Sequence, residues 1–317
     1  MKKAIFFTVI ILLGCQNDSK IVLASSGNLN EVSVVIENDL WEGAVGKELK
    51  TAFSKPIYGL PQQEKQFILR QMPPGIFSGF ATKSRVIIKI ESNKKKGINV
   101  VSNKYASPQK IIVISGANAN QIIQQIRSKT KEIFSILRNS EIREKKRRIK
   151  KSLSSSSSLK KVFNITLDYP SIYREASVLE NFVWLRKDTK SGSVNLSIFE
   201  APLTRDKLSK QKIIAIRDSV AKTTIPGPTL GTYMTTDPEY RAVSKPIIIN
   251  KKTGMETRGL WEVKKQFMGG PFINFSIVDS TNRRILYFDG FVYSPGTAKA
   301  DYIFELEAII KSLKILK

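Results

Sequence analysis

The residues available for chemistry are few in kind, because the 317-residue sequence contains no histidine and a single cysteine. Without histidine the chain cannot use Ser-His-Asp or Cys-His catalysis, an HExxH zinc helix or an imidazole proton shuttle. With one cysteine it cannot form an intrachain disulfide, a CxxC redox pair or a cysteine-built zinc site. The commonest catalytic and metal-binding arrangements are therefore excluded.

Carboxylates and a serine remain as candidate catalytic groups. The carboxylates are Glu42, Asp237, Glu256 and Asp289, and no spacing in the sequence brings any two of them together. Ser78 lacks the GxSxG elbow, so only a Ser-Lys hydrolase with Lys83 or Lys89 as the base stays open. The carboxylates also lack the EF-hand spacing. We expect no enzymatic activity, no metal and no cofactor.

The single cysteine lies at the end of a stretch typical of a secretory signal. Lys2 and Lys3 give it a positive start, and residues 4–13 are apolar but too few to span a hydrocarbon core of about 30 Å. The sequence Leu12-Leu13-Gly14-Cys15 resembles the lipobox of bacterial lipoproteins. That resemblance implies cleavage before Cys15, a diacylglycerol on its thiol and an acyl chain such as palmitate on the new amino terminus. The alternative is a signal peptide that ends in cysteine by chance.

The residues after Cys15 favour the outer membrane. By the same resemblance, Gln16 stands where an aspartate would retain a lipoprotein in the inner membrane. No acidic cluster follows, so we expect no export to the cell surface. No later stretch approaches 18 apolar residues. We therefore expect the acyl chains on Cys15 to be the only membrane attachment, with the body of the protein in the periplasm.

Two stretches rich in proline, glycine and aromatic residues, residues 73–80 and 261–272, are candidates for a partner interface. Rigid loops that display aromatic side chains suit such a role. The candidate interface residues are Phe77, Phe80, Arg258, Trp261, Phe267, Met268 and Phe272. Two alternatives stay open: the apolar side chains tuck under their own hairpins, or Arg258 pairs with Glu256 or Glu262 across a strand.

Positive charge marks a second candidate surface. The chain carries 52 Lys and Arg against 27 Asp and Glu, a net charge of +25 that attracts polyanions. The densest basic run consists of Arg143, Lys145, Lys146, Arg147, Arg148, Lys150 and Lys151. In an envelope lipoprotein, the anions that this basic run could bind are phospholipid head groups, lipopolysaccharide phosphates or an acidic partner. We expect no nucleic acid, given the compartment and the lack of a binding motif. A solvated helix end is the alternative.

These residues must be positioned by two α+β units. In the first, residues 31–36 alternate like a strand, and a helix follows with an apolar stripe formed by Trp41, Val45, Leu49 and Phe53. Further strands are expected at residues 66–72, 85–91, 98–102 and 111–115, before a long helix from residue 118 or 120. This order predicts a mostly antiparallel sheet with helices on one side.

The second unit has the pattern of a strand meander with two helices. Strands are expected at residues 162–169, 182–187, 193–200, 245–250, 255–267, 272–279 and 284–293, and helices at residues 204–222 and 301–316. Nine basic residues and five consecutive serines in residues 141–161 favour a flexible connector.

The predicted fold class is α+β with two domains, each a mostly antiparallel sheet packed by helices. The expected divisions are a signal peptide (1–14), a lipidated cysteine and tether (15–30), an N-terminal domain (31–140), a connector (141–161) and a C-terminal domain (162–317).

Several longer motifs together resemble a family of Bacteroidetes lipoproteins known only as a domain of unknown function. They are Leu40-Trp41-Glu42-Gly43, Gly59-Leu60-Pro61-Gln62, residues 73–80, Phe182-Val183-Trp184-Leu185-Arg186, Arg217-Asp218-Ser219-Val220, Pro226-Gly227-Pro228, Tyr233-Met234-Thr235-Thr236, residues 256–261 and residues 267–272. The resemblance covers nearly all of the mature chain and implies a compartment but no reaction. The second unit is also similar in element order to the PsbP-like fold of photosystem accessory proteins, which implies a binding or assembly role.

Together these features predict a membrane-anchored, non-catalytic envelope lipoprotein that recognises an envelope protein partner. Two alternatives remain. One is a lipoprotein that binds phospholipid or lipopolysaccharide through the basic run, and the other is a histidine-free hydrolase.

Overall fold

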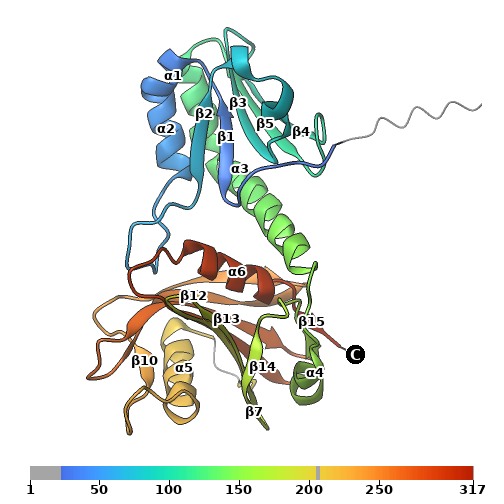
Figure 1. Cartoon of the computed structure of the whole chain (residues 1–317). Coiled ribbons are helices and arrows are strands. Elements are labelled where there is room, and N and C mark those ends of the chain that lie inside the picture. The colour runs from blue at the N-terminus through green and yellow to red at the C-terminus, as the bar shows by residue number, and fades with distance from the viewer. Residues whose placement is uncertain (1–22, 205–207, 317) are drawn as a thin grey trace, which may run out of the picture.

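The computed structural model describes residues 23–204 and 208–316 and places them in two stacked units (Figure 1). Each unit contains a β-sheet with helices packed on it. The prediction of an α+β fold with two sheet-containing units is therefore confirmed.

The first unit is built on five strands in the order β2-β1-β3-β5-β4. The strands are β1 (Glu31–Val35), β2 (Ile68–Met72), β3 (Val86–Ser92), β4 (Gly97–Ser102) and β5 (Lys110–Gly116). The helices are α1 (Asn38–Glu42), α2 (Ala44–Phe53) and α3 (Ala119–Ile149), and two short 3-10 helices, η1 (Pro74–Ile76) and η2 (Gly79–Lys83), lie between β2 and β3.

The two faces of this sheet are covered differently. Alternate residues of the strands, such as Val34 and Ile88, pack with α2 and α3 in one core cluster. Residues of the opposite parity, Val35, Ile87 and Ile111, face the segment between β2 and β3, whose Phe77 packs on them. The helices thus lie on one side, as the strand periodicity predicts.

The predicted mostly antiparallel arrangement of the first sheet is wrong. β1 pairs parallel with both β2 and β3, β3 pairs parallel with β5, and only β4 and β5 are antiparallel. The physical reason is that the chain crosses over the sheet after β1, through α1 and α2, and crosses again after β2, through residues 73–85. Such crossovers return a strand in the same direction, whereas a tight turn reverses it.

The second unit contains an eight-stranded antiparallel sheet in the order β10-β12-β13-β14-β9-β8-β7, with β11 also paired to β12. Its strands are β7 (Arg174–Leu179), β8 (Phe182–Thr189), β9 (Gly192–Pro202), β10 (Met234–Thr236), β11 (Val243–Ile249), β12 (Lys252–Val263), β13 (Gly269–Asp279) and β14 (Arg284–Tyr293). α6 (Ala300–Ile310) packs on one face and α5 (Lys210–Thr224) on the other. The antiparallel prediction holds for this sheet.

The predicted flexible connector at residues 141–161 is largely helical. α3 continues to Ile149, and α4 (Ser157–Phe163) starts within the serine run. Ile142 and Ile149 are buried in the core of the second unit, so tertiary packing stabilises helix where local composition disfavours it. Figure 1 shows α3 running from the first unit onto the second.

Three further element boundaries differ from the predictions. The strand expected at residues 162–169 is reduced to β6 (Ile165–Thr166), which pairs with β15 (Lys314–Ile315). α5 starts at Lys210, because Ser209 caps it by accepting a hydrogen bond from the Lys212 amide, 3.3 Å away. α6 ends at Ile310, and the chain then turns into β15.

Candidate functional site

An aromatic pocket of about 220 Å³ opens on the α5 face of the second sheet. Its walls are mainly aromatic and thioether side chains from β8, β10, β12 and β14, together with the turn after α5. The main wall residues are Trp184, Met234, Trp261, Met268, Phe291 and Tyr293. We call this site the aromatic pocket.

The rings of the aromatic pocket are held in place by one another and by satisfied hydrogen bonds. The Phe291 ring centroid lies 5.7 Å from that of Trp261, edge-on, and 6.4 Å from that of Trp184. The Trp184 indole donates to Asn195 Oδ1 at 3.1 Å, and the Trp261 indole donates to the Val292 carbonyl at 3.3 Å. With both indole N–H groups engaged by the protein, the cavity presents an apolar surface suited to an apolar side chain.

Two turns form the rim of the aromatic pocket and carry fully exposed apolar side chains. Leu230 lies on the turn between α5 and β10 and is 102% exposed, and Phe267 lies on the turn between β12 and β13 and is 112% exposed. Gln266 Nε2 donates to Thr229 Oγ1 at 3.2 Å, so the two turns lie side by side. Large apolar side chains this exposed are typical of interaction sites when they flank a pocket.

The rim turn after α5 depends on a close approach at Gly227. A Cβ there would lie 2.3 Å from Thr232 Oγ1 and 2.8 Å from Val263 Cγ1. Only glycine therefore lets this turn lie against β12, and the flanking Pro226 and Pro228 restrict its backbone.

The aromatic pocket offers little for bond-making chemistry. Its titratable lining residues are Arg186, which pairs with Asp188 at 2.7 Å, and Tyr293. Among residues 23–204 and 208–316, no group of three or more His, Cys, Asp or Glu could hold a metal ion. The lining is suited to binding an apolar group.

A buried ion pair beneath the pocket fixes α5 to the sheet. Arg217 Nε lies 2.9 Å from Asp289 Oδ1, and its guanidinium stacks 4.1 Å from the Phe272 ring. Asn274 Nδ2 donates to the same Asp289 oxygen at 3.0 Å. Burial raises the pKa of Asp289, although Arg217 and Asn274 partly oppose that effect. Asp289 is therefore a core residue of the α5–sheet contact.

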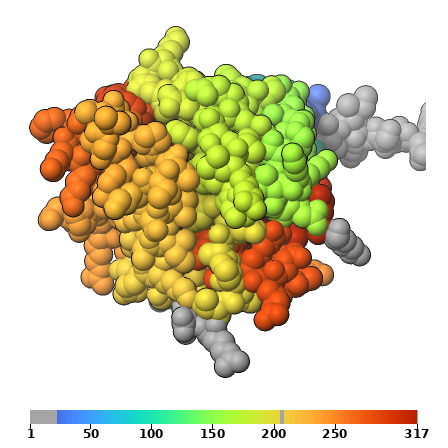
Figure 2. Space-filling view, turned by 90° about the horizontal axis from the view of Figure 1, so that it is seen from below, coloured from blue at the N-terminus to red at the C-terminus, as the bar shows by residue number. Residues whose placement is uncertain are grey.

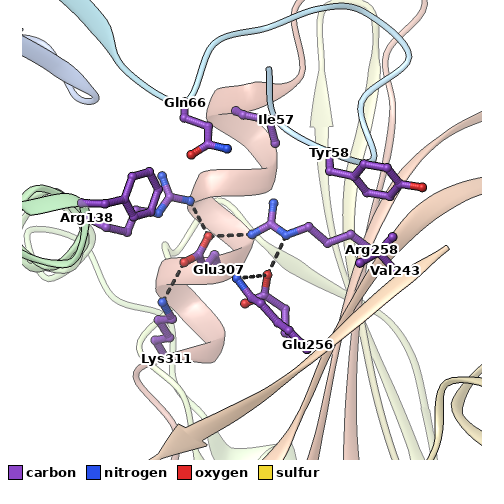
Figure 3. A pocket seen from close by; sticks show the side chains of 11 residues that line it. Ile57, Tyr58, Gln66, Arg138, Val243, Glu256, Arg258, Glu307 and Lys311 are labelled. Atoms are coloured by element: carbon purple, nitrogen blue, oxygen red, sulfur yellow. Dashed lines mark hydrogen bonds and ion pairs between the residues drawn. The ribbon is translucent and has the colours of Figure 1, made fainter. Parts of the chain in front are cut away.

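A second cavity, of about 240 Å³, lies at the junction of the two units (Figure 3). At its centre, Glu307 of α6 lies 3.0 Å from Arg258 Nη2 and 2.7 Å from Lys311 Nζ, and it also pairs with Arg138 of α3. Arg258 Nε pairs in turn with Glu256 at 2.7 Å. We call this site the junction cavity.

The charges of the junction cavity bind one another. Burial raises the pKa of Glu307, but the charges of Arg138, Lys311 and Arg258 outweigh it and hold that pKa well below its usual range. A carboxylate held ionised in this way cannot serve as a general acid near neutral pH. The network therefore joins α3 to the second unit.

Five of the predicted interface residues lie on the second unit, and three of these lie at the aromatic pocket. Trp261, itself buried, and Met268 line it, and Phe267 lies on its rim. Phe272 does not belong to an exposed surface, which is a correction, because it is buried under Arg217 in the α5-side core. Arg258 lies in the junction cavity, where it pairs with Glu256, the alternative considered from the sequence.

The two predicted interface residues of the first unit have different surroundings. Phe77 is half-buried, because it packs on the sheet and meets the Tyr105 ring edge-on at 5.9 Å. Its assignment to an exposed interface is therefore corrected to the alternative of a side chain tucked under its own loop. Phe80 is 75% exposed and lies on the first unit, apart from the aromatic pocket.

The predicted polyanion-binding run is largely used within the protein. Lys145 pairs with Glu305 at 2.7 Å, and Lys146 donates to the Lys311 carbonyl. Arg147 and Arg148 pair with Glu144 at 2.7 and 2.8 Å. The Lys145 and Lys146 contacts fix the end of α3 on the second unit, whereas the Glu144 pairs lie within α3 itself.

The remaining residues of this run, Arg143, Lys150 and Lys151, are exposed. Lys150 Nζ lies 3.9 Å from Asp168. The cationic surface that these three residues offer is smaller than the seven basic residues of the run indicate.

Sequence reasoning missed several residues of the aromatic pocket. These are the lining residues Trp184, Met234, Phe291 and Tyr293 and the rim residue Leu230. Trp184, Met234 and the Pro226-Gly227-Pro228 turn do occur in the motifs quoted above, but nothing in the sequence shows that they converge. Antiparallel pairing of β8, β9 and β14 brings together residues that are more than 100 positions apart in the sequence, such as Trp184 and Phe291.

Cys15 and the signal and tether residues up to 22 lie outside the described residues. Within the part of the chain that the structure describes, no helix is long and apolar enough to cross a membrane.

Comparison with protein families gives two matches. A domain of unknown function (DUF4837) matches residues 152–312, just over half of the chain, and a second (DUF8532) matches residues 25–150. No curated protein matches the sequence.

Comparison with solved structures finds several distant likenesses. The Saccharomyces cerevisiae Ran-binding protein Mog1p is 7% identical, with 49% of this chain and 91% of that chain covered at a TM-score of 0.35. A Bacteroides thetaiotaomicron protein is 14% identical (49% and 46% covered, TM-score 0.30), and the human StarD13 lipid transfer and protein localization domain is 9% identical (45% and 90% covered, TM-score 0.22).

Proposed function

The chain belongs to the family of the domain of unknown function DUF4837, and from this premise we propose that it is a lipid-anchored, non-catalytic binding protein of the cell envelope. It captures an envelope protein partner through the aromatic pocket of its second unit. Within this proposal the chain is a Bacteroidetes lipoprotein with a PsbP-like second unit, anchored through Cys15 to the outer membrane and facing the periplasm.

One observation carries the proposal: an apolar pocket whose rim displays Leu230 and Phe267 with their side chains fully in solvent. Burying two such side chains against a partner removes apolar surface from water at little desolvation cost. A pocket of about 220 Å³ between aromatic walls has room for one apolar side chain of that partner.

The position of the pocket supports recognition of a partner away from the anchoring membrane. In Figure 1, β10, which follows the rim turn, lies at the lower end of the second unit, whereas the described chain begins beside the first unit. The view from below in Figure 2 is dominated by the second unit, and several of its turns project at the edges. Acyl chains that confine the protein to a surface raise its effective concentration there, so that modest contacts suffice.

Photocrosslinking in living cells tests the proposal. A photoreactive amino acid replaces Phe267 or Leu230, and replaces Ile248 as a matched control, because Ile248 is an equally apolar and 73% exposed side chain on β11. We expect one discrete envelope-protein adduct at the first two positions and none at the third. Trp184→Ala, which opens the pocket wall, reduces that adduct about tenfold or more.

Membrane fractions of the same cells test the anchor, since Cys15→Ala releases the protein. Equal labelling at Ile248 and Phe267 would contradict recognition through the pocket. An adduct yield that Trp184→Ala leaves unchanged would contradict it as well.

A further inference from the structure

Four exposed apolar side chains lie on the first unit near the point where the described chain begins. Leu23 is 50% exposed, Ile76 64%, Phe80 75% and Tyr105 39%. They come from three separate segments, and two of those segments also carry lysines, Lys83 and Lys104. We call these six residues the entry patch.

Backbone hydrogen bonds hold the three segments of the entry patch side by side. The Ser107 amide donates to the Leu23 carbonyl at 2.8 Å, and the Ser26 amide donates to the Lys83 carbonyl at 2.9 Å. Gln109 Nε2 donates to the Thr82 carbonyl at 2.6 Å, which ties the second segment to the third. The three segments that carry the patch are thus adjacent on the first unit.

The charge of the entry patch is positive. Lys83 Nζ lies 6.0 Å from the Phe80 ring centroid and Lys104 Nζ 5.1 Å from that of Tyr105, and neither lysine has a carboxylate partner among the described residues. Between Lys65 and Lys131 the sequence contains one acidic residue, Glu91, and it is already paired with Lys89 at 2.7 Å. Among the described residues, no carboxylate therefore pairs with the lysines of the patch.

The length of the tether places this patch near the membrane. Seven residues lie between Cys15 and Leu23, so eight residue-to-residue steps join them. A fully extended chain spans at most about 3.5 Å per step, or about 28 Å in all. The diameter of a small domain is about 30 Å, so a lipidated Cys15 keeps the start of the described chain within one domain diameter of the lipid.

We propose that the entry patch docks on the surface of the anchoring bilayer, with Ile76 and Phe80 entering the interface and Lys83 and Lys104 contacting anionic lipid head groups. This proposal rests on the lipid anchor of the proposed function. Aromatic and aliphatic side chains flanked by lysines are the composition that membrane interfaces favour, because the apolar groups enter the lipid while the ammonium groups stay among the phosphates. Docking in this way orients the second unit, and with it the aromatic pocket, away from the membrane.

The full lipidated protein tests this proposal in reconstituted vesicles. One set of vesicles contains phosphatidylcholine with phosphatidylglycerol, and the other contains phosphatidylcholine alone. A fluorophore is attached through Ser78→Cys, between Ile76 and Phe80, or through Ser280→Cys, an exposed control on the second unit. Spin-labelled lipids then quench any fluorophore that lies at the bilayer surface.

We expect quenching at position 78 in the anionic vesicles, weaker quenching in the neutral ones, and none at position 280. Raising the salt concentration from 0.1 to 1 M shortens the Debye length from about 10 to about 3 Å and should lower the quenching. Phe80→Ser combined with Lys104→Glu should lower it about fivefold or more, because one basic residue near an anionic surface accounts for about that factor. Ile248→Ser with Lys161→Glu, an exposed pair on the second unit, should leave it unchanged.

Weak quenching at both positions in vesicle-bound protein overturns docking but leaves the anchor and the partner site intact. Equal quenching at both positions, or in both kinds of vesicle, also overturns it. If Cys15 carries no lipid and the protein separates from the vesicles, the proposed lipid anchor is contradicted as well. Photocrosslinking at Phe267 then tests the partner site separately.

Discussion

Glu144 illustrates how single residues turn the basic run of α3 into a structural contact. The carboxylate is buried, and it accepts hydrogen bonds from Arg147 and Arg148 at 2.7 and 2.8 Å. Burial raises the pKa of Glu144, but these hydrogen bonds outweigh it and lower the pKa from 4.5 to about 2. The positive charges that suggest a polyanion site are therefore partly neutralised by a neighbour three or four residues away.

Acid titration should detect this carboxylate. Its folded pKa lies below its unfolded pKa, so its contribution to the free energy of unfolding is complete above pH 4.5 and is lost as the pH falls toward 2. The full shift corresponds to about 3 kcal/mol, and solvent screening of the two exposed guanidinium groups reduces it to about 2 kcal/mol.

Urea unfolding of the wild type and Glu144→Gln across that pH range measures this contribution. We expect the two curves to converge as the pH falls, because both proteins then lack the charge. The buried Glu305 and Glu307 have lowered pKa values and Asp289 a raised one, and these effects are common to both proteins. Parallel curves would show that Glu144 does not have the lowered pKa.

At the scale of elements, the two units meet through one helix end and one long helix. α6 has no capping side chain of its own, and Glu64, in the loop between α2 and β2, accepts hydrogen bonds from the Lys299 and Ala300 amides at 2.8 Å each. A carboxylate at a helix N-terminus satisfies unpaired N–H groups and favours the positive end of the helix dipole. A loop of the first unit thus completes a helix of the second.

Glu64→Ala should lower the free energy of unfolding by about 1–2 kcal/mol, the usual contribution of such a cap. Glu64→Gln should retain part of it, since an amide oxygen can still accept one hydrogen bond but brings no charge to the helix dipole. Chemical denaturation measures both, with Glu180→Ala, an exposed turn carboxylate of the second unit, as the control. An unchanged stability in Glu64→Ala would contradict the capping role.

At the scale of the whole molecule, the junction cavity determines whether the two units unfold together. Glu307 is shared by Arg138 of the first unit and by Arg258 and Lys311 of the second. The Arg138 guanidinium also stacks 4.3 Å from the Phe304 ring centroid on α6. Removing one member of a buried charge network leaves the others unpaired, which typically costs about 3–5 kcal/mol.

Calorimetry tests this coupling. We expect one unfolding transition in the wild type and two separated transitions in Glu307→Ala, because the first unit then loses the Arg138–Glu307 ion pair with α6. Glu132→Ala, which removes an exposed ion pair on α3, is the matched control and should keep a single transition. Two transitions already present in the wild type would show that the units are not coupled through this cavity.

Local signals account for what could be predicted. The alternation of residues 31–36, the stripe formed by Val45, Leu49 and Phe53, and the meander from β12 to β14 all depend on spacings of two to four residues. The exposure of Phe267 could be predicted, because the glycine-rich turn that carries it is a local feature of the sequence.

The sequence by itself therefore determined the fold class, most strands, the absence of imidazole and thiol-pair chemistry, and the candidate anchor at Cys15. Only the tertiary structure decided that the first sheet is mostly parallel, that α3 continues to Ile149 inside the predicted connector, and that Trp184, Met234 and Phe291 line one pocket. The physical reason is the range of the interactions. Hydrophobic periodicity and turn chemistry act over a few residues, whereas strand direction, burial of Ile149 and convergence of side chains depend on contacts between residues far apart in the chain.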